Sequence, residues 1–240
     1  MRVLVAGAGG FGDSCVGQLV EAGASVLVVD RDAARLADVA ASPRFRGVTA
    51  QLDLSDPGSG RQAVQTAIQE LGGLDAAVHL VGINDRRPIL EFSESDWARI
   101  LETNLSTAFR LGQAVGRHLL SQGGGAMVFA SSVSGLLAHR NHGPYAASKG
   151  GMNQLARVMA AEWAESGVRV NMIAPGYVET NLTRAHLQVP GVREDLERLI
   201  PMKRLGTADD VASAIVYLLS PRAGYITGHV LYIDGGRTLV

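Results

Sequence analysis

The sequence predicts an α/β protein with a single domain over residues 1–240, built as a doubly wound, seven-stranded parallel sheet with helices on both faces. Two observations predict this fold class. Short runs of apolar and β-branched residues alternate along the whole chain with longer segments of helical period. The 240 residues are 47% hydrophobic, and we find no repeat, low-complexity tract or linker that would divide the chain.

Each expected strand is a short apolar run, and each expected helix lies between two such runs. The strands are RVLVA from Arg2, SVLVV from Ser25, VTAQL from Val48, AAVHLV from Ala76, AMVFA from Ala126, VRVNMI from Val168 and HVLYI from His229. The helices span residues 11–22, 33–40, 60–70, 94–121, 145–166 and 209–220. Glycine and proline clusters such as DPGSG at Asp56 mark the loops between them. Right-handed crossovers then determine how the helices pack on the sheet.

Composition excludes several classes of partner. The formal net charge is −1 and the basic residues are scattered, so the sequence predicts no nucleic-acid and no membrane partner. Cys15 is the single cysteine, which excludes an intrachain disulfide, and we predict no metal site. We find no signal-peptide pattern and no apolar stretch of about 18 residues. We therefore expect a cytoplasmic protein that acts on a small molecule, with Cys15 packed as a small hydrophobe.

A glycine-rich loop, AGAGGFG, follows the first expected strand and precedes a helix. Glycines in such a loop let the backbone approach a pyrophosphate, and the N–H groups and dipole of the helix start attract its charge. A tight strand-to-helix turn would also explain the glycines, so the motif alone is weak. The candidate cofactor-binding residues of the loop are Gly7, Gly9, Gly10, Phe11 and Gly12.

Asp30 supports the cofactor-binding interpretation of this loop. It ends the second apolar run, 23 residues after Gly7, where a carboxylate accepts hydrogen bonds from ribose hydroxyls and repels a 2′-phosphate. Arg31 follows it and would instead pair with that phosphate. We predict that NAD is preferred over NADP as the cofactor. The structural alternative for Asp30 is a helix N-cap.

A second motif, PYAASKGG, places Lys149 four residues after Tyr145, and Ser132 lies thirteen residues before that tyrosine. Positions four apart share one face of a helix, so the phenol and the ammonium would project into the same cleft. A free phenol has a pKa near 10, and a neighbouring cation lowers such a pKa by about 1 to 3 units. Together the three residues predict a dehydrogenase active site, although a lone serine at a strand end is ordinarily a turn former.

Along essentially its whole length, the chain resembles the compact form of the short-chain dehydrogenase/reductase family, whose members include 3-oxoacyl-[acyl-carrier-protein] reductases. Besides the glycine loop, the resemblance lies in SSVSG at Ser131, PYAASKGG at Pro144, VNMIAPGYVET from Val170 and ITGHVLYIDGG from Ile226, all in the family's order. It implies a Rossmann-type fold and an NAD(P)-dependent oxidoreductase. The implied reaction interconverts a secondary alcohol and a ketone, or a 3-oxoacyl thioester, by hydride transfer.

The resemblance also implies roles for individual residues. The implied catalytic residues are Asn104, Ser132, Tyr145 and Lys149. Tyr145 would be the acid/base, Lys149 its activator and Ser132 the hydroxyl that positions the substrate oxygen. The implied cofactor contacts beyond the loop are Asp53, Leu54, Gly82, Tyr145, Lys149, Pro175, Gly176, Val178 and Thr180. The family further implies a homotetramer or a homodimer.

Three features depart from the family pattern. Ala6 stands where a threonine is usual, the loop has one residue fewer between Gly7 and Gly10, and His79 stands where many relatives carry asparagine. The short loop shifts backbone donors relative to a pyrophosphate, so we expect weaker cofactor affinity. The alternative function is therefore a non-redox relative, either dehalogenase-like or a nucleotide-sensing binding protein. The presence of Asp30, Tyr145 and Lys149 argues against both.

The segment at about residues 181–205 is expected to form a variable lid over the substrate. Leu182, Leu187, Val189, Leu196 and Leu199 are expected to line a partly apolar pocket under it. A loop histidine is usually solvated, so we assign no catalytic role to His139 or His142. The structural alternative for Asn104 is a hydrogen bond to nearby backbone within its helix.

Overall fold

The expected seven-stranded sheet is confirmed in a computed structural model that describes residues 1–180, 183–184 and 187–240. All neighbouring strands are parallel, and their order is β3-β2-β1-β4-β5-β6-β7. The strands are β1 (Arg2–Ala6), β2 (Ser25–Asp30), β3 (Gly47–Gln51), β4 (Ala76–His79), β5 (Gly125–Ala130), β6 (Val168–Pro175) and β7 (Val230–Ile233).

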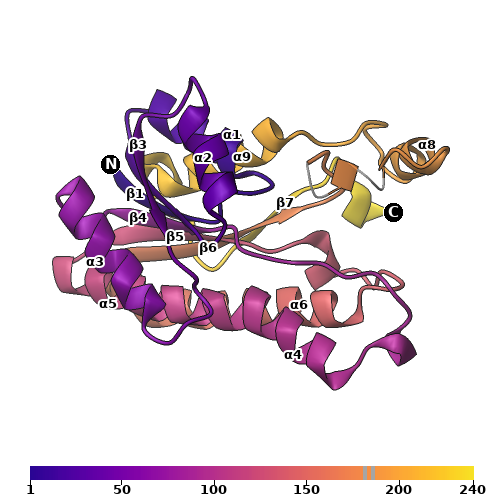
Figure 1. Cartoon of the computed structure of the whole chain (residues 1–240), viewed down its shortest axis with the longest axis horizontal. Coiled ribbons are helices and arrows are strands. Elements are labelled where there is room, and N and C mark those ends of the chain that lie inside the picture. Colours follow the sequence, from indigo (N-terminus) through magenta and orange to yellow (C-terminus); the bar gives the residue numbers. More distant parts are fainter. Residues whose placement is uncertain (181–182, 185–186) are drawn as a thin grey trace.

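Helices cover both faces of this sheet (Figure 1). One face carries α1 (Gly12–Glu21), α2 (Ala33–Ala41) and α9 (Ala208–Leu219), and the other carries α3 (Ser59–Leu71), α5 (Thr107–Gln122) and α6 (Gly143–Trp163). Two shorter helices, α4 (Glu94–Leu101) and α8 (Val192–Arg198), lie outside these two layers.

The sequence of β1 explains why it needs cover on two sides. Val3 and Val5 point into the cluster that α1, α2 and α9 complete, while Leu4 and Ala6 point into the cluster formed with α3, α5 and α6. All four side chains are fully buried. An apolar run without alternation is the expected signature of a parallel strand buried on both faces.

One helix that the sequence predicts as continuous is interrupted in the structure. The segment expected as a single helix over 94–121 consists of α4, a π-helical segment at Glu102–Ser106, and α5. Asn104 lies in the π-helical segment, and its side chain bonds outside the helix rather than along it. The extra residue in this turn rotates Asn104 toward the end of β4, and π segments of this kind occur often at functional sites.

The strand order reverses between β1 and β4, which are neighbours although two strands lie between them in the sequence. Loops that leave the carboxyl ends of such neighbours diverge to opposite faces and open a crevice, which is where doubly wound sheets bind ligands. The glycine-rich loop follows β1, and Gly82 follows β4. Within the described part of the chain, no helix is both long and apolar enough to cross a membrane.

Candidate active site

Two cavities adjoin at the carboxyl ends of the strands. The larger, of about 430 Å³, is lined by Ser132, Tyr145 and Lys149, and the smaller, of about 120 Å³, by the glycine loop and Asp30. The residues that line both are Phe11, Leu80, Gly82, Ile83 and Thr180. The fold therefore joins the two predicted sites, which are far apart in the sequence, into one cleft.

The glycine loop forms the floor of the smaller cavity. Its start is tied to the sheet by Gly7, whose N–H donates to the carbonyl oxygen of Val29 at 2.8 Å. Gly7 has a φ of +107°, and a methyl group there would lie 3.1 Å from the backbone of Leu80 and Val81, so this position requires glycine. Gly9, Gly10 and Phe11, the next candidate cofactor-binding residues, line the cavity. Gly12 lies behind the loop, buried as the first residue of α1.

Asp30 lies in the same cavity and holds the loop from the side. Its Oδ2 accepts from the N–H of Ala8 at 2.8 Å, and its Oδ1 accepts from the N–H of Asp32 at 2.9 Å. The N-cap of α2 is Asp32, whose side chain accepts from Ala34 and Arg35. The N-cap alternative for Asp30 is therefore wrong, and Asp30 lines the smaller cavity together with the glycine loop.

Arg31 and Asp53 flank Asp30 on the wall of the smaller cavity. Arg31 Nη1 lies 3.8 Å from Asp53 Oδ2, so the guanidinium is already opposed by a carboxylate. Ser55 donates to Asp53 Oδ1 through both its hydroxyl, at 2.7 Å, and its backbone N–H, at 2.9 Å. The hydroxyl bond to Ser55 is the main reason that the pKa of Asp53 is lowered. Leu54 lines the cavity beside Asp53, and Arg35, which the sequence did not indicate, also lines it.

Tyr145 and Ser132 meet in the larger cavity. Tyr145 lies in the first turn of α6, while Ser132 follows β5 and its hydroxyl accepts from the N–H of Ser134 at 3.1 Å. The expected lowering of the Tyr145 pKa by Lys149 is wrong. Burial raises that pKa, and the effects that oppose the rise are a hydrogen bond to Ser132 and the charge of Arg86. Loss of hydration outweighs both of them.

Lys149 is almost fully buried, with 3% of its surface exposed. Its Nζ donates to the carbonyl oxygen of Ala130 at 2.7 Å and lies 5.6 Å from the centre of the Tyr145 ring. Burial lowers the pKa of Lys149 to about 8. A methyl group on Gly82 would lie 3.3 Å from this ammonium, so Gly82 leaves room for the lysine beside the cleft.

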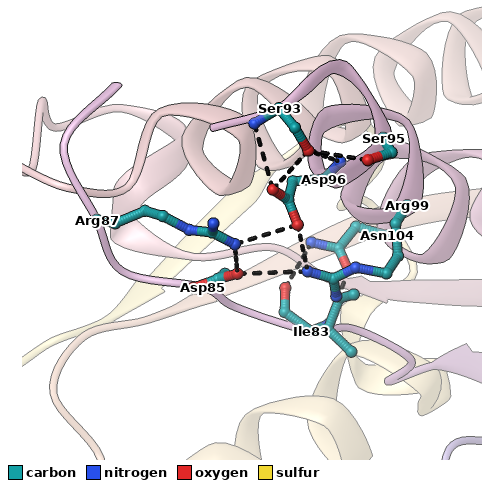
Figure 2. A network of polar contacts seen from close by, with 8 residues as sticks. All are labelled: Ile83, Asp85, Arg87, Ser93, Ser95, Asp96, Arg99 and Asn104. Carbon is teal, nitrogen blue, oxygen red and sulfur yellow. Dashed lines mark hydrogen bonds and ion pairs between the residues drawn. The ribbon is translucent and has the colours of Figure 1, made fainter. Parts of the chain in front are cut away.

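Asn104 is fully buried and does not line either cavity. Its amide nitrogen donates to the carbonyl oxygen of Ile83 at 2.9 Å and to Ser148 Oγ at 3.0 Å, and its Oδ1 accepts from the N–H of Ile83 at 2.8 Å. Figure 2 shows this pairing with Ile83. Asn104 thus ties the loop after β4 to α6, in contacts across the fold rather than within its own helix.

His79 replaces the usual asparagine with another tie across the centre of the fold. Its Nε2 lies 2.9 Å from Thr107 Oγ1, which in turn donates to the carbonyl oxygen of Thr103. Because the hydroxyl proton is used there, the network assigns the His79 proton to Nε2. Burial and the charge of Lys149 lower the pKa of His79 to about 3, so this histidine is neutral.

The segment after β6 forms the wall opposite Tyr145. Pro175, Gly176, Val178 and Thr180, which the resemblance implies as cofactor contacts, all line the larger cavity. Of the expected lid residues, Leu187 and Leu196 line it, joined by Leu205. Val189 and Leu199 are 52% and 46% exposed, so those two expectations are wrong. Leu182 lies outside the described residues, as do other parts of 181–186.

Sequence reasoning assigned no role to several side chains of the larger cavity, among them Arg86 and His139. The expectation of a solvated His139 is wrong, because its Nδ1 lies 2.9 Å from Ser134 Oγ and its ring packs 6.0 Å from that of Tyr177. His142 also lines the cavity. The only available signal was position, since His139 and His142 lie in the loop between Ser132 and Tyr145.

The buried thiol of Cys15 packs as the sequence predicts. Cys15 is fully buried, and burial raises the pKa of its thiol to about 12, which fits a small hydrophobe. Among the described residues, no group of three or more His, Cys, Asp or Glu side chains could hold a metal ion.

Comparison with known proteins agrees with this geometry. The sequence profile of the enoyl-(acyl carrier protein) reductase family matches residues 5–238. Galactitol 2-dehydrogenase (L-tagatose-forming) of Cereibacter sphaeroides is 36% identical over 98% of this chain and 94% of its own length. The 3-oxoacyl-[acyl-carrier-protein] reductase of Salmonella typhimurium is 33% identical over 99% of this chain and 97% of its own.

A solved structure gives the same result in three dimensions. Gluconate 5-dehydrogenase of Burkholderia cenocepacia, in complex with NADP and tartrate, superimposes with a TM-score of 0.93 at 33% identity, covering 100% of this chain and 95% of its own. Likeness over the whole length thus coincides with a dinucleotide-type loop and a Tyr145/Lys149 pair in one cleft. The chain belongs to the short-chain dehydrogenase/reductase family and is an NAD(P)-dependent oxidoreductase that acts on CH–OH or keto groups.

Proposed function

We propose that the protein interconverts a secondary alcohol and a ketone with Tyr145 as the acid/base. The observation that carries the proposal is the adjacency of two sites. Tyr145 and Ser132 line the larger cavity, and this cavity shares Gly82 and Thr180 with the one that contains the glycine loop and Asp30. A substrate oxygen between the two hydroxyls would place its carbon next to a dinucleotide bound along the loop.

In the reduction direction, the Tyr145 hydroxyl gives its proton to the substrate oxygen while Ser132 holds the same oxygen by a hydrogen bond. Oxidation is the reverse and starts from the Tyr145 phenolate, which takes the proton of the substrate hydroxyl. A bound nicotinamide supplies the hydride acceptor in oxidation and the donor in reduction. Lys149, whose charge persists below about pH 8, stabilises negative charge on the tyrosine side of the cleft. Asn104 and Lys149 are proposed to connect the site to solvent protons. The proximity of both side chains to Gly82 supports this proposal, because a methyl group there would lie 3.3 Å from Lys149 Nζ and 3.5 Å from Asn104 Oδ1.

The substitution Tyr145→Phe tests the mechanism. Because it removes only the hydroxyl, we expect kcat to fall by about 10²- to 10⁴-fold, the usual contribution of a positioned acid/base. The affinity for NADH, measured by fluorescence titration, should stay unchanged. Tyr217→Phe, on α9, is the matched control and should keep full activity. Full turnover in Tyr145→Phe would exclude the mechanism.

We further propose that NAD is preferred over NADP. Asp30 lines the smaller cavity, where we expect the adenosine ribose to bind, while Asp53 already opposes the charge of Arg31. Both features disfavour a 2′-phosphate. Equilibrium titration should therefore give a lower dissociation constant for NADH than for NADPH, and Asp30→Ser should narrow or reverse the difference. Tighter binding of NADPH by the unaltered protein would contradict this preference and assign the cofactor selectivity to Arg31 and Arg35.

We also propose that the protein is cytoplasmic, works as a homotetramer or homodimer, and has a small-molecule alcohol or ketone as its partner rather than a nucleic acid or a membrane. The formal net charge of −1 supports the choice of partner. Apolar side chains on the outer faces of α5 and α6, among them Phe109 and Val158, support self-association.

A further inference from the structure

Arg86 and Arg87 are consecutive in the loop after β4, yet they face different surroundings. Arg86 lines the larger cavity. Arg87 lies in a cluster of charged side chains between this loop and α4 (Figure 2), and its guanidinium also stacks on Phe92, 4.8 Å from the ring centre. The two arginines therefore have to be considered separately.

The cluster around Arg87 is neutral in itself. Arg87 Nη2 lies 2.5 Å from Asp85 Oδ2 and 3.1 Å from Asp96 Oδ1. Arg99 Nη2 lies 3.3 Å and 3.4 Å from the same two oxygens. The two carboxylates neutralise the two guanidinium groups. Asp85 in the loop and Asp96 in α4 are therefore both paired with arginines other than Arg86. Among the described residues, no carboxylate lies within ion-pair distance of Arg86.

The backbone of this loop is held at both ends. Asn104 bonds both the N–H and the carbonyl oxygen of Ile83, and the N–H of Arg87 donates to the carbonyl oxygen of Asn141 at 3.2 Å. Asn141 belongs to the turn that leads into α6 and Tyr145. Arg86 is thus positioned between two anchored neighbours, next to the segment that carries the acid/base. Its charge acts on both neighbours: it partly opposes the rise that burial causes in the Tyr145 pKa, and it adds to the lowering that burial causes in the His139 pKa.

The cavity itself carries only positive charge. Arg86 and Lys149 line it, and no aspartate or glutamate of the described chain does. The Nε2 atom of His139 is buried there without a hydrogen-bond partner, and the charge of Arg237 also acts on this imidazole. An exposed guanidinium without an ion-pair partner and a buried, unpartnered ring nitrogen in the lining of the same cavity are complementary to an anion with hydroxyl groups.

We propose that Arg86 binds the carboxylate of a hydroxy-acid or keto-acid substrate, whose reacting oxygen lies between Tyr145 and Ser132 and whose further oxygen is bound by His139. This inference rests on the proposed function and adds the substrate class to it. Arg86 contacts the end of the substrate that does not react, so it determines specificity and takes no part in the proton or hydride transfer. Asp85, Asp96, Arg87 and Arg99 act as positioning residues because they hold the loop.

The test compares two probes that share a carbon chain, D-gluconate with its terminal carboxylate and D-glucitol with a hydroxymethyl group in its place. Dissociation constants are measured by calorimetry in the presence of NADH, which requires no turnover. Unaltered protein should bind gluconate more tightly than glucitol. Arg86→Gln should weaken gluconate binding by roughly 10- to 100-fold, the effect of losing one charge-assisted hydrogen bond, with little change for glucitol. Arg86→Lys should restore part of the loss.

Arg61→Gln is the matched control, because Arg61 is an exposed arginine of α3 without a described ion pair and far from the cavity lining. This variant should bind both probes with unchanged dissociation constants. In steady-state oxidation, Arg86→Gln should raise KM for gluconate by the same factor and leave kcat nearly unchanged, as expected for uniform binding.

Three outcomes would overturn the assignment of Arg86. The unaltered protein does not bind gluconate, it binds the two probes with equal affinity, or Arg86→Gln loses affinity for both probes by the same factor. The proposed function fails separately, if no alcohol gives hydride transfer with either cofactor. In that case the comparison of gluconate and glucitol binding still tests whether Arg86 binds a carboxylate, because it requires no turnover.

Discussion

Among the described residues, Lys149 is the one lysine, arginine, aspartate or glutamate that is almost completely buried, and burying its charge has an energetic cost. Its pKa falls from 10.5 to about 8, so between these values the unfolded chain holds a proton that the folded chain has released. Folding stability attributable to this lysine is therefore lowest below pH 8 and rises as the pH increases from about 8 to 10.5. The whole shift corresponds to about 3 kcal/mol.

The substitution Lys149→Met, which keeps the length of the side chain and removes the charge, tests this cost. The difference in free energy of unfolding between the unaltered protein and the variant should move in favour of the unaltered protein as the pH rises through this window. Urea denaturation of both proteins at several pH values measures it, and other titrating groups cancel in the difference. A pH-independent difference would mean that Lys149 keeps its ordinary pKa. Turnover should be lost in the variant at every pH.

At the residue scale, the sequence predicted the position of a site residue where its place within one helix or strand determines that position. Tyr145 and Lys149 lie on one helix, so a separation of four residues predicted their shared face. Ser132 and Asp30 end strands, and parallel strands bring their carboxyl ends together. Arg86 and His139 have no such local signal. The direction of the Tyr145 pKa could not be predicted either, because it depends on how completely the folded cleft removes water from the phenol.

At the scale of elements, the π-helical segment at Glu102–Ser106 joins the loop after β4 to α6 through a single side chain. Asn104→Ala would leave both backbone groups of Ile83 and the Ser148 hydroxyl without this partner. We expect a loss of about 2 to 4 kcal/mol in the free energy of unfolding, since each unpaired buried group costs about 1 to 3 kcal/mol. Urea denaturation measures the loss.

Asn104→Asp separates the two kinds of contact. The aspartate keeps the acceptor for the N–H of Ile83 but loses the donor to the Ile83 carbonyl oxygen. The free energy of unfolding of this variant should therefore fall by more than that of a surface control. Gln113→Ala, on the exposed face of α5, should change stability by less than about 0.5 kcal/mol. Hydrogen exchange at the Ile83 amide should accelerate in Asn104→Ala. Unchanged exchange there would contradict the anchoring role.

The seven strands could be predicted from the sequence because each is an apolar run between glycine-rich or polar loops. The break in the helix over 94–121 could not, since apolar residues continue with helical period through the π-helical segment. The lid was predicted only in part. Leu187 and Leu196 line the cavity whereas Val189 and Leu199 face solvent, and composition alone does not decide which side of a lid a leucine faces.

At the scale of the whole molecule, the outer layer of α5 and α6 carries apolar surface that one chain does not cover. Phe109 on α5 and Val158 on α6 are each 46% exposed, and Trp97 on α4 is 45% exposed. Helices α4 and α5 both pack against α6, so the three exposed side chains lie on helices that contact one another. A soluble monomer rarely exposes large apolar patches, so this layer is the proposed interface between copies.

Light scattering coupled to size-exclusion chromatography should give a mass of two or four times 25.2 kDa for the unaltered protein. The double substitution Phe109→Glu/Val158→Glu places two charges on the outer layer and should shift the mass toward the monomer, because a buried unpaired charge costs several kcal/mol. Leu136→Glu is the control, as Leu136 is 61% exposed and lies outside these helices. A monomeric mass for the unaltered protein, or no shift in the double variant with its fold intact by circular dichroism, would contradict this interface. In the first case the active site is complete within one chain, and the apolar layer needs another explanation.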